Sequence, residues 1–324
     1  MSSHFNGFIN LNKPLHWTSH DCVARVRRLL NMKKIGHGGT LDPLATGVLP
    51  LAMGRATRLI QYLPERKVYC AVIRFGLTTT TDDLAGEVLT EQVATHLQRE
   101  AVEAHLPQFL GCLSQVPPMY SAVQVQGKRL YHLARQGKTV EIPPRQVMIH
   151  QLTGQGWQAG EQPELTLMID CGPGTYIRSL ARDLGQMVGT GATLAQLSRT
   201  HSSGFDIASS MTLADLEEAI ASARFVPSSA LKAVQHLAAL TLSPSLAHRW
   251  CMGQKLSLAE PGISGLIPQY EPLGTSLRIM DDSTGDFLGI GEIRAVPPVE
   301  SSDNLWDNEL PHILVAKCVF RAVD

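Results

Sequence analysis

The chain has 324 residues, of which 44% are hydrophobic and 18% are charged, and its formal net charge is −1. This length and composition exclude a disordered chain and predict one large domain, or one large and one small domain. No run of about 18 apolar residues and no signal-peptide pattern occurs, and the six cysteines lie dozens of residues apart without a CxxC pair. We therefore expect a cytoplasmic protein without a membrane span, a disulfide framework or a metal site.

Positive charge is concentrated near the N-terminus. Residues 1–74 hold eleven basic and three acidic residues, a net charge of +8, so the rest of the chain carries −9. Clustered Arg and Lys residues in an otherwise acidic chain are typical of a surface that binds a polyanion. A solvated helix face would account equally well for Arg25, Arg27 and Arg28. Charge alone leaves both interpretations open.

The first elements can be read from residue patterns. GFINLN (7–12) predicts a short strand that ends at Lys13-Pro14. Residues 18–21 form a capping box, which predicts a helix whose apolar stripe is Cys22, Val26, Leu29 and Leu30. Residues 35–47 hold too many Gly and Pro residues for regular structure, and residues 67–76 predict a strand.

The middle of the chain alternates between helix and strand patterns. We predict a helix over residues 91–110, a loop entering a strand over 115–123 and a helix around 130–136. ELTLMIDC (164–171) alternates like a half-buried strand. A Gly-Pro-Gly turn then begins a helix over 175–188, with one face formed by Ile177, Leu180, Ala181 and Leu184.

From about residue 240 the composition changes to short segments broken by Pro, Gly, Ser and Asp. Residues 277–293 predict two strands around a turn that contains glycine, and residues 312–320 predict a closing strand. We take residues 296–311 to be a loop. The chain is therefore divided into a first domain over 1–238 and a small β-rich domain over 241–324.

The most informative stretch is GHGGTLDPLATG (36–47). Its carboxylate, Asp42, precedes a proline in a loop with four glycines, so the residue is extended on a backbone that a ligand can approach closely. A lone Asp-Pro is more often a turn or cap residue, and a lone histidine such as His37 more often bonds within its loop. Spacing alone therefore favours a structural role.

Several familiar site motifs are missing from the sequence. GHGGTLDP lacks the spacing and the lysine of a phosphate-binding P-loop. Residues 189–193 lack the dinucleotide fingerprint, and neither GxSxG nor HExxH occurs. A nucleotide-binding loop, a hydrolase triad of the GxSxG type and a zinc protease are thus excluded.

Five stretches in order decide the interpretation: FINLNKPLHWTSHDCV, GHGGTLDPLATGVLPL, KVYCAVIRFG, QVPPMYSAVQVQGKRLYHLARQG, and DCGPGTYIRSLARDLG continuing to LSRTHSSGF. Together they span most of residues 8–205 and resemble the TruB family of pseudouridine synthases, whose signature is a GHxGxLDPxAxG loop. The resemblance implies an α+β fold: a pseudouridine synthase catalytic domain with a mixed, mostly antiparallel sheet flanked by helices, and a small C-terminal PUA-like β domain.

The resemblance also implies roles for individual residues. Asp42 matches the catalytic aspartate, Tyr69 the active-site tyrosine on the neighbouring strand, and Arg178 the arginine that pairs with the aspartate. Among the substrate-binding positions, Tyr176 and Leu197 match residues that line the uracil pocket, as Tyr69 also does by stacking. His37 matches the histidine that fills the space left by the flipped nucleotide, and Lys13 belongs to a lysine-proline motif that supports the active-site loop.

The implied reaction is the isomerisation of uridine to pseudouridine in the T-loop of tRNA, at position 55. The C1′–N1 bond breaks, the base turns, and C1′ joins C5, so no cofactor and no metal is needed. An ionised Asp42 would act as a nucleophile at C1′ or as a base at C2′, and the sequence leaves both routes open. Fork-shaped pairing with Arg178 would keep the carboxylate ionised. His37 would assist the flipping of the base.

Departures from the family pattern concern RNA contacts. Gln124 stands where the family often has lysine, Gly172-Pro173 where a polar-basic pair is common, and Ser198 where a second arginine is usual. Each change removes a possible phosphate contact. Residues 241–324 hold six basic and eleven acidic residues, which is unfavourable for a domain that binds RNA. We expect the T-arm of tRNA as the partner, no obligate protein partner, and a monomer.

Three alternatives were weighed against a tRNA enzyme. A non-catalytic RNA-binding protein is disfavoured because Asp42, Tyr69 and Arg178 are intact. A synthase of the guide-RNA-dependent branch is disfavoured because the N-terminus is short and basic tails are missing. A carbohydrate-active hydrolase would need a second catalytic carboxylate in a comparable loop, and the sequence shows none.

Overall fold

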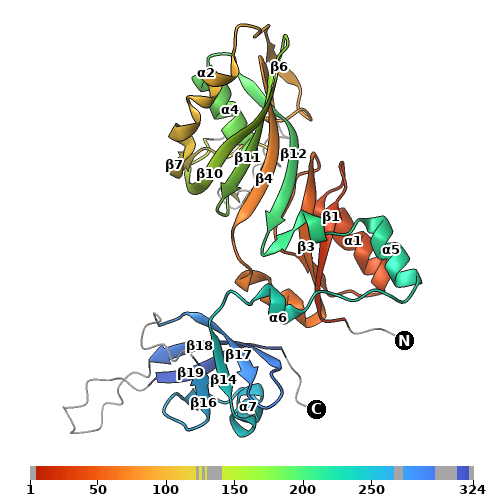
Figure 1. Cartoon of the computed structure of the whole chain (residues 1–324), viewed down its shortest axis with the longest axis vertical. Helices are drawn as coiled ribbons and strands as arrows, with labels where there is room; N and C mark the ends of the chain where they lie inside the picture. The colour runs from red at the N-terminus through yellow and green to blue at the C-terminus, as the bar shows by residue number, and fades with distance from the viewer. Residues whose placement is uncertain are drawn as a thin grey trace, which may run out of the picture.

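The computed structural model describes residues 5–121, 141–265, 273–295 and 312–320, and the backbone of 124–125 and 128–129. The helix predicted around 130–136, the loop predicted over 296–311 and the side chain of Gln124 lie outside the described residues. Two sheets form separate parts of the molecule, and the C-terminal one lies at the lower end of the long axis (Figure 1).

The main sheet has nine strands in the described part of the chain, and its path is β1-β3-β12-β4-β11-β10-β7, with β2 paired to β3 and β13 to β12. All of these pairs are antiparallel except β3 with β12. The predicted α+β fold with a mixed, mostly antiparallel sheet is therefore confirmed. The strands are β1 (Gly7–Lys13), β2 (Ile35–His37), β3 (Ala45–Met53), β4 (Lys67–Phe75), β7 (Gly111–Gln115), β10 (Arg145–Gln158), β11 (Glu164–Cys171), β12 (Ala192–Ser202) and β13 (Phe205–Asp206).

Two helices, α1 (Ser19–Leu30) and α4 (Ile177–Met187), bury their apolar stripes in one large core with the main sheet. The predicted capping box is confirmed, because Thr18 and Asp21 exchange side-chain and backbone hydrogen bonds at the start of α1. The stripe of α4 is buried as predicted. The other helical elements of this part are α2 (Arg99–Glu103), α5 (Leu213–Ala221), α6 (Ala230–Ala233), η1 (Gly54–Tyr62), η2 (Leu106–Phe109) and η3 (Ile207–Ser209).

A second sheet begins at Ala239 and has six strands within the described residues, in the order β15-β19-β18-β17-β14-β16. It forms a core around the fully buried Trp250. The predicted pair of strands, the turn with Gly285 and the closing strand are confirmed. The elements are β14 (Ala239–Leu242), α7 (Pro244–Cys251), β15 (Leu256–Ser257), β16 (Ile263–Gly265), β17 (Ser276–Asp281), β18 (Phe287–Ala295) and β19 (His312–Val319).

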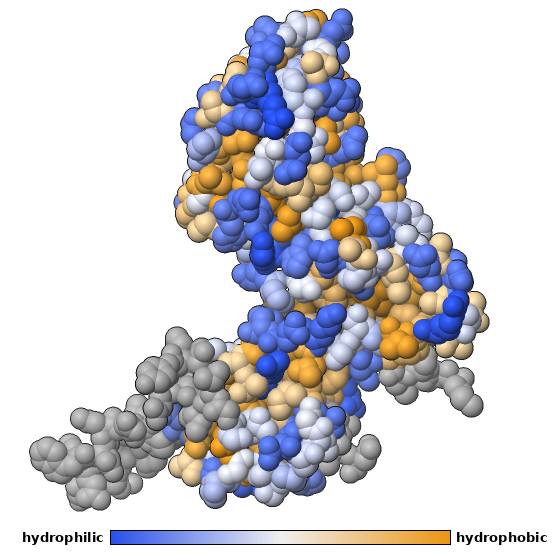
Figure 2. All heavy atoms as spheres, in the orientation of Figure 1, coloured by the Kyte–Doolittle hydropathy of each residue, from blue (hydrophilic) through white to orange (hydrophobic). Residues whose placement is uncertain are grey.

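The two sheets meet across η1 and α6 at the narrow neck visible in Figures 1 and 2. Apolar residues from both sides share one buried cluster, including Leu59 and Phe205 on one side and Phe287 and Ile290 on the other. Two arginines of η1 also cross the junction, as Arg55 Nη1 donates to Phe320 O at 3.0 Å and Arg58 Nη1 to Val319 O at 3.2 Å. The second sheet is thus packed against the first part of the chain.

Two sequence-based predictions need correction. The helix expected over 91–110 is wrong: β6 (Val88–Glu91) pairs with β5 (Leu77–Thr79), and only the short α2 and η2 follow. Residues 35–47 are irregular only in their middle, since β2 and β3 enter at both ends. The loop predicted to enter a strand is confirmed over its described residues, 116–121, and the strand that follows is β8 (Gln124–Val125), which pairs with β9 (Lys128–Arg129). No helix among the described residues is long and apolar enough to cross a membrane.

Candidate active site

Asp42 lies in the loop between β2 and β3, and α1 holds that loop in place. Ser19 Oγ accepts a hydrogen bond from Leu41 N at 2.8 Å and donates one to Leu41 O at 3.2 Å. The amide of His16 donates to Pro43 O at 2.8 Å. The backbone is therefore fixed on both sides of Asp42, whose side chain remains 40% exposed. A macromolecular substrate can reach this carboxylate.

The carboxylate of Asp42 forms an ion pair with Arg178, in the first turn of α4. Arg178 Nη2 lies 2.9 Å from Asp42 Oδ2, and the arginine side chain is only 6% exposed. The hydrogen bonds of this guanidinium go to backbone carbonyls: Nη1 donates to Thr81 O at 3.1 Å and Nη2 to Tyr120 O at 3.0 Å. Nη2 therefore contacts both Asp42 and a carbonyl, and the fork-shaped pairing through two nitrogens stays a prediction.

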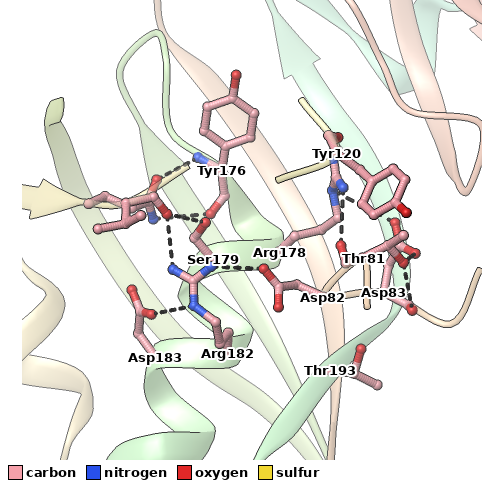
Figure 3. Close-up of polar contacts among 12 residues, drawn as sticks. Thr81, Asp82, Asp83, Tyr120, Tyr176, Arg178, Ser179, Arg182, Asp183 and Thr193 are labelled. Carbon is pink, nitrogen blue, oxygen red and sulfur yellow. Dashed lines mark hydrogen bonds and ion pairs between the residues drawn. The ribbon is translucent and has the colours of Figure 1, made fainter. Parts of the chain in front are cut away.

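A second carboxylate, Asp83, lies behind the same arginine. Its Oδ2 is 3.7 Å from Arg178 Nε, and its side chain is 7% exposed. Asp83 Oδ1 accepts hydrogen bonds from Thr81 Oγ1 at 2.5 Å and Ala85 N at 3.0 Å. Arg178 thus lies between a solvent-facing carboxylate, Asp42, and a buried one, Asp83. Figure 3 shows Arg178 with Thr81, Asp83 and Tyr120 in its right half. The sequence analysis missed Asp83, for which the Asp-Asp pair at 82–83 was the available signal.

Helix α4 also binds the two segments whose carbonyls contact Arg178, one at Asp82 and one at Val116. Arg182 bonds Asp82 Oδ2 and Asp183 Oδ1 at 2.8 and 2.9 Å, and its Nη2 donates to Val116 O at 2.9 Å. Ser179 Oγ donates to the same carbonyl at 2.8 Å. Figure 3 shows these contacts converging on one side of α4. Burial raises the pKa of both Asp82 and Asp183, and the Arg182 charge opposes that shift.

Tyr176 caps the N-terminus of α4, two residues before Arg178. Its amide donates to Gln115 Oε1 at 2.9 Å, and its carbonyl accepts from Gln115 Nε2 at 3.1 Å. The ring points away from the contacts of Arg182 in Figure 3. The buried amide of Gln115 therefore fixes the backbone at the residue that was predicted to line the uracil pocket.

Tyr69 and Leu197 are neighbours on the central strands. Tyr69 of β4 is paired in register with Arg199 of β12, and Leu197 of β12 is paired with Ala71 of β4 and Ala45 of β3. Both side chains are buried, at 7% and 9% exposed. Burial raises the pKa of the Tyr69 hydroxyl, while the charge of Arg199 opposes this shift. The hydroxyl is therefore protonated at neutral pH.

Arg199 was not recognised from the sequence as a site residue. Its side chain is fully buried, and its guanidinium donates to Val48 O at 2.8 Å, Gly39 O at 3.2 Å and Thr40 O at 3.4 Å. Two of these carbonyls belong to the loop of Asp42. The available signal was the arginine in LSRT, which stands in a strand that is otherwise mostly buried.

His37 and Lys13 flank the same loop. His37 ends β2, and its Nδ1 is buried without a hydrogen-bond partner among the described residues. Burial lowers the pKa of His37, and the neighbouring His20 and Arg199 lower it further, so the ring is neutral at pH 7. Lys13 is fully buried, and its Nζ donates to Pro14 O at 2.9 Å and Trp17 O at 2.6 Å. This lysine fixes the turn whose His16 amide contacts Pro43.

Several of the N-terminal basic residues have partners within the chain, so they do not form one continuous surface of unpaired positive charge. Arg25, Arg66 and Arg74 form ion pairs with Glu217, Asp170 and Glu164, at 2.5, 2.7 and 2.8 Å. Arg55 and Arg58 bond the second sheet, as described above. Arg28, Lys33 and Lys34 are exposed. The polyanion surface predicted from charge is therefore narrower than the sequence count indicates.

One cavity, of about 600 Å³, does not include Asp42. Its lining is Asn12, Lys13, Pro14, Trp17, Thr46, Ser198, Ile207, Thr212, Leu213 and Ala214. Its position between the end of β1 and α5 gives it no contact with Tyr69 or Arg178. The cavity and the Asp42–Arg178 pair are therefore separate features of this part of the molecule. Among the residues described, no cluster of His, Cys, Asp and Glu side chains could hold a metal ion.

Comparison with known proteins identifies relatives over nearly the whole chain. Residues 27–177 match the family model described as TruB family pseudouridylate synthase (N terminal domain), and residues 178–236 and 238–296 match two models of the corresponding C-terminal domains. Proteins named tRNA pseudouridine synthase B from Nostoc sp. and Acaryochloris marina are 51% and 54% identical, over 89% of this chain and 95% and 94% of theirs.

A solved structure with the same fold is that of a Cbf5-Nop10-Gar1 complex. The likeness has a TM-score of 0.70 at 27% sequence identity and covers 98% of this chain and 85% of that one. An H/ACA ribonucleoprotein bound to a substrate RNA containing 2′-deoxyuridine gives a TM-score of 0.69 at 24% identity, covering 97% of this chain and 85% of that chain. The fold described above is therefore shared with proteins of known structure.

Proposed function

The chain belongs to the TruB family of pseudouridine synthases and is an isomerase of tRNA, and from that premise we propose that it converts the uridine at position 55 in the T-loop, with Asp42 as the catalytic carboxylate. One observation carries this proposal. Asp42 is the exposed member of an ion pair whose other member, Arg178, is almost fully buried. A carboxylate held in this way has a fixed position and is still open to a substrate.

The reaction needs an ionised carboxylate because the C1′–N1 bond must break. Asp42 either attacks C1′ or removes the proton from C2′, and the released uracil then turns and joins C1′ through C5. The proton at C5 leaves and N1 gains one, so the atoms balance without an oxidant, a cofactor or a metal. The guanidinium of Arg178 would stay paired with the Asp42 carboxylate during these steps.

The remaining site residues are assigned to substrate binding. The Tyr69 ring would stack on the target base, and its hydroxyl would face the region where the C5 proton leaves. Leu197 and Tyr176 would line the uracil pocket, and Lys13 would support the loop. His37, which is neutral and partly buried, would occupy the space left when the base is flipped out of the T-loop. Each of these roles rests on the match of the residue to a site position of the family.

A stand-alone tRNA enzyme fits the comparisons better than a guide-RNA-dependent one. The relatives that are 51–54% identical over most of both chains are named for tRNA. The likeness to the Cbf5-Nop10-Gar1 complex is at 27% identity. We further propose that the first part, over 1–238, holds the catalytic site, that residues 241–324 form an accessory domain, and that the protein acts as a monomer in the cytoplasm, consistent with the six free cysteines.

The test is Asp42→Asn, assayed on a T-arm stem-loop RNA under single-turnover conditions. We expect the rate of pseudouridine formation to fall at least ~10⁴-fold, because the residue acts on the bond-breaking step itself. RNA affinity should stay within about tenfold of wild type. A matched control is Glu164→Gln, which breaks an ion pair with Arg74 elsewhere on the main sheet. An Asn variant with a tenth of the wild-type rate would overturn the assignment.

A further inference from the structure

A buried positive charge under the Asp42 loop has no role in the reaction as described so far. The Arg199 side chain is fully buried. In the described part of the chain its guanidinium bonds three backbone carbonyls and no carboxylate. Arg178, by contrast, is close to two carboxylates. Arg199 is therefore a buried cation without an acidic partner.

Such an arrangement is unfavourable for stability. Removing a charged group from water costs several kcal/mol even after relaxation, and apolar replacements of buried charges are often neutral or stabilising. Packing alone would be satisfied by an apolar residue on β12, where Leu194 and Leu197 are buried in the main core. A guanidinium buried at this position despite its cost therefore points to a function that needs its hydrogen-bond donors or its charge.

The three carbonyls indicate that function. Gly39 O and Thr40 O belong to the residues that lead into Asp42, and Val48 O belongs to β3 after the loop. One rigid, planar group therefore ties the start of the loop to the strand at its end. A lysine could not reproduce this, because its donors radiate from a single atom.

A glycine of β3 permits the close approach of the strand that carries Arg199. Gly47 is the register partner of Arg199 in the parallel pair of β3 and β12, with φ of +100°. A Cβ at Gly47 would lie 2.3 Å from Arg199 O, which no side chain allows. Gly47 thus lets β12 pack closely against β3 at Arg199.

The charge of Arg199 also reaches the other groups of the site. It lowers the pKa of Tyr69 on β4, of His37 on β2, of Lys13 on β1 and of Lys67 at the start of β4, although burial is the largest influence on each. Arg178 on α4 faces Asp42 from the other side. The charge of Arg199 therefore acts on groups of three different strands around the loop.

We propose that Arg199 is a positioning residue, which holds the Gly39 and Thr40 carbonyls so that Asp42 faces Arg178 and Tyr69 in the reactive geometry. The inference rests on the proposed role of Asp42. It assigns to Arg199 no contact with RNA, so substrate binding does not depend on it. Loss of the three-point contact moves the carboxylate away from the sugar and slows the chemical step.

The test compares Arg199→Gln, Arg199→Lys and Thr200→Val on the full-length protein. Thr200 is the next residue of β12, and its hydroxyl bonds Val68 O, so its replacement controls for general disturbance of the strand. For Arg199→Gln we expect kcat to fall about 10²-fold, the loss typical of a misplacement of about 1 Å, with KM within threefold. Arg199→Lys keeps the charge, so its kcat should be about tenfold higher than that of Arg199→Gln and about tenfold lower than that of the wild type. Thr200→Val should keep the wild-type kcat.

A merely structural role would show a different pattern. It would lower the melting temperature and the soluble yield, while the folded enzyme kept its kcat. A folded Arg199→Gln variant with kcat within threefold of wild type would overturn the inference. If that variant does not fold, Arg199→Lys decides alone: a fall in kcat of about tenfold at constant KM supports the inference, and a wild-type kcat overturns it.

Asp42→Asn, measured in the same series, separates the two proposals. An active Asn variant would remove the proposed function, whatever Arg199 does. An inactive Asn variant beside an unimpaired Arg199→Gln variant would remove only the positioning role.

Discussion

Arg178 Nη2 contacts Asp42 Oδ2 at 2.9 Å with the same nitrogen that donates to Tyr120 O at 3.0 Å. This ion pair is thus joined directly to the backbone at the end of the segment that begins with Gln115. The buried Asp83 faces the other edge of the guanidinium. The position of Asp42 therefore depends on several segments that are far apart in the sequence.

Arg178→Lys should be poorly tolerated. An ammonium group can replace the contact with Asp42 or those with Thr81 O and Tyr120 O, but it cannot make all three. We expect kcat to fall by about 10²-fold with KM nearly unchanged, as measured by steady-state kinetics on a T-arm RNA. Arg99→Lys, in an exposed ion pair with Glu103, serves as the control. Near-normal kcat in Arg178→Lys would show that the guanidinium is not needed.

Tyr69→Phe removes only the hydroxyl and keeps the ring. If the hydroxyl acts after glycosidic cleavage, the single-turnover rate should fall while RNA binding is unchanged. Because burial raises the pKa of this hydroxyl above its ordinary value of about 10, it stays protonated from pH 6 to 9. The ratio of the variant rate to the wild-type rate should therefore be constant over that range. An unaltered rate would show that the hydroxyl is not needed and that only the Tyr69 ring takes part, by stacking on the base.

RNA binding should depend strongly on salt, because neutralised phosphates release counterions. Lys33 and Lys34 are exposed beside the strand that leads into the Asp42 loop. Charge reversal at both lysines should weaken binding and flatten the plot of log K against log salt by about one unit per lost phosphate contact. Binding titrations at several salt concentrations measure this slope. An unchanged slope would assign both lysines to the solvated surface.

Arg55→Ala with Arg58→Ala should behave differently, although both arginines belong to the same basic stretch. Their guanidinium groups bond the Phe320 and Val319 carbonyls of the second sheet. We expect the salt slope to be unchanged and the melting temperature to fall by a few degrees, since each lost bond is worth about 1 kcal/mol. A flattened salt slope without loss of stability would instead place these arginines on RNA.

Removal of residues 239–324 tests the accessory role of the second sheet. Its acidic balance predicts few phosphate contacts, so affinity for full-length tRNA should fall by only about 1–2 kcal/mol, with little change in kcat on an isolated T-arm. The truncation also uncovers Leu59 and Phe205, so the shortened chain should be less soluble. A soluble truncation with a hundredfold lower kcat on the T-arm would show that the second sheet takes part in catalysis.

The elements predicted correctly are those with regular patterns. The strand β11 alternates without interruption, and the stripe of α4 and the capping box of α1 follow from local side-chain geometry. Strands β10 and β12 were not predicted, because register shifts interrupt their alternation. The helix expected over 91–110 was wrong because β6 and the proline of η2 divide that segment.

The site was predictable only where a motif carried it. Asp42, Tyr69 and Arg178 were named from family resemblance, and spacing alone favoured a structural role for Asp42. Asp83 and Arg199 were missed because nothing in a single sequence shows that a charged residue is buried. The carbonyls of Thr81 and Tyr120, which bind the Arg178 guanidinium, were missed for a related reason, because a sequence does not show which backbone acceptors face a side chain.

The order of strands in the main sheet has a consequence for synthesis of the protein. Strand β12 inserts between β3 and β4, so that Leu197 pairs with Ala45 and Ala71. Until residue 202 has left the ribosome, β3 and β4 each present an unpaired edge, for on the order of ten seconds at ordinary elongation rates. Tyr69 and Asp42 cannot be brought together before then. The nascent chain should therefore bind chaperones until β12 is translated, and ribosome profiling with chaperone capture would detect the release.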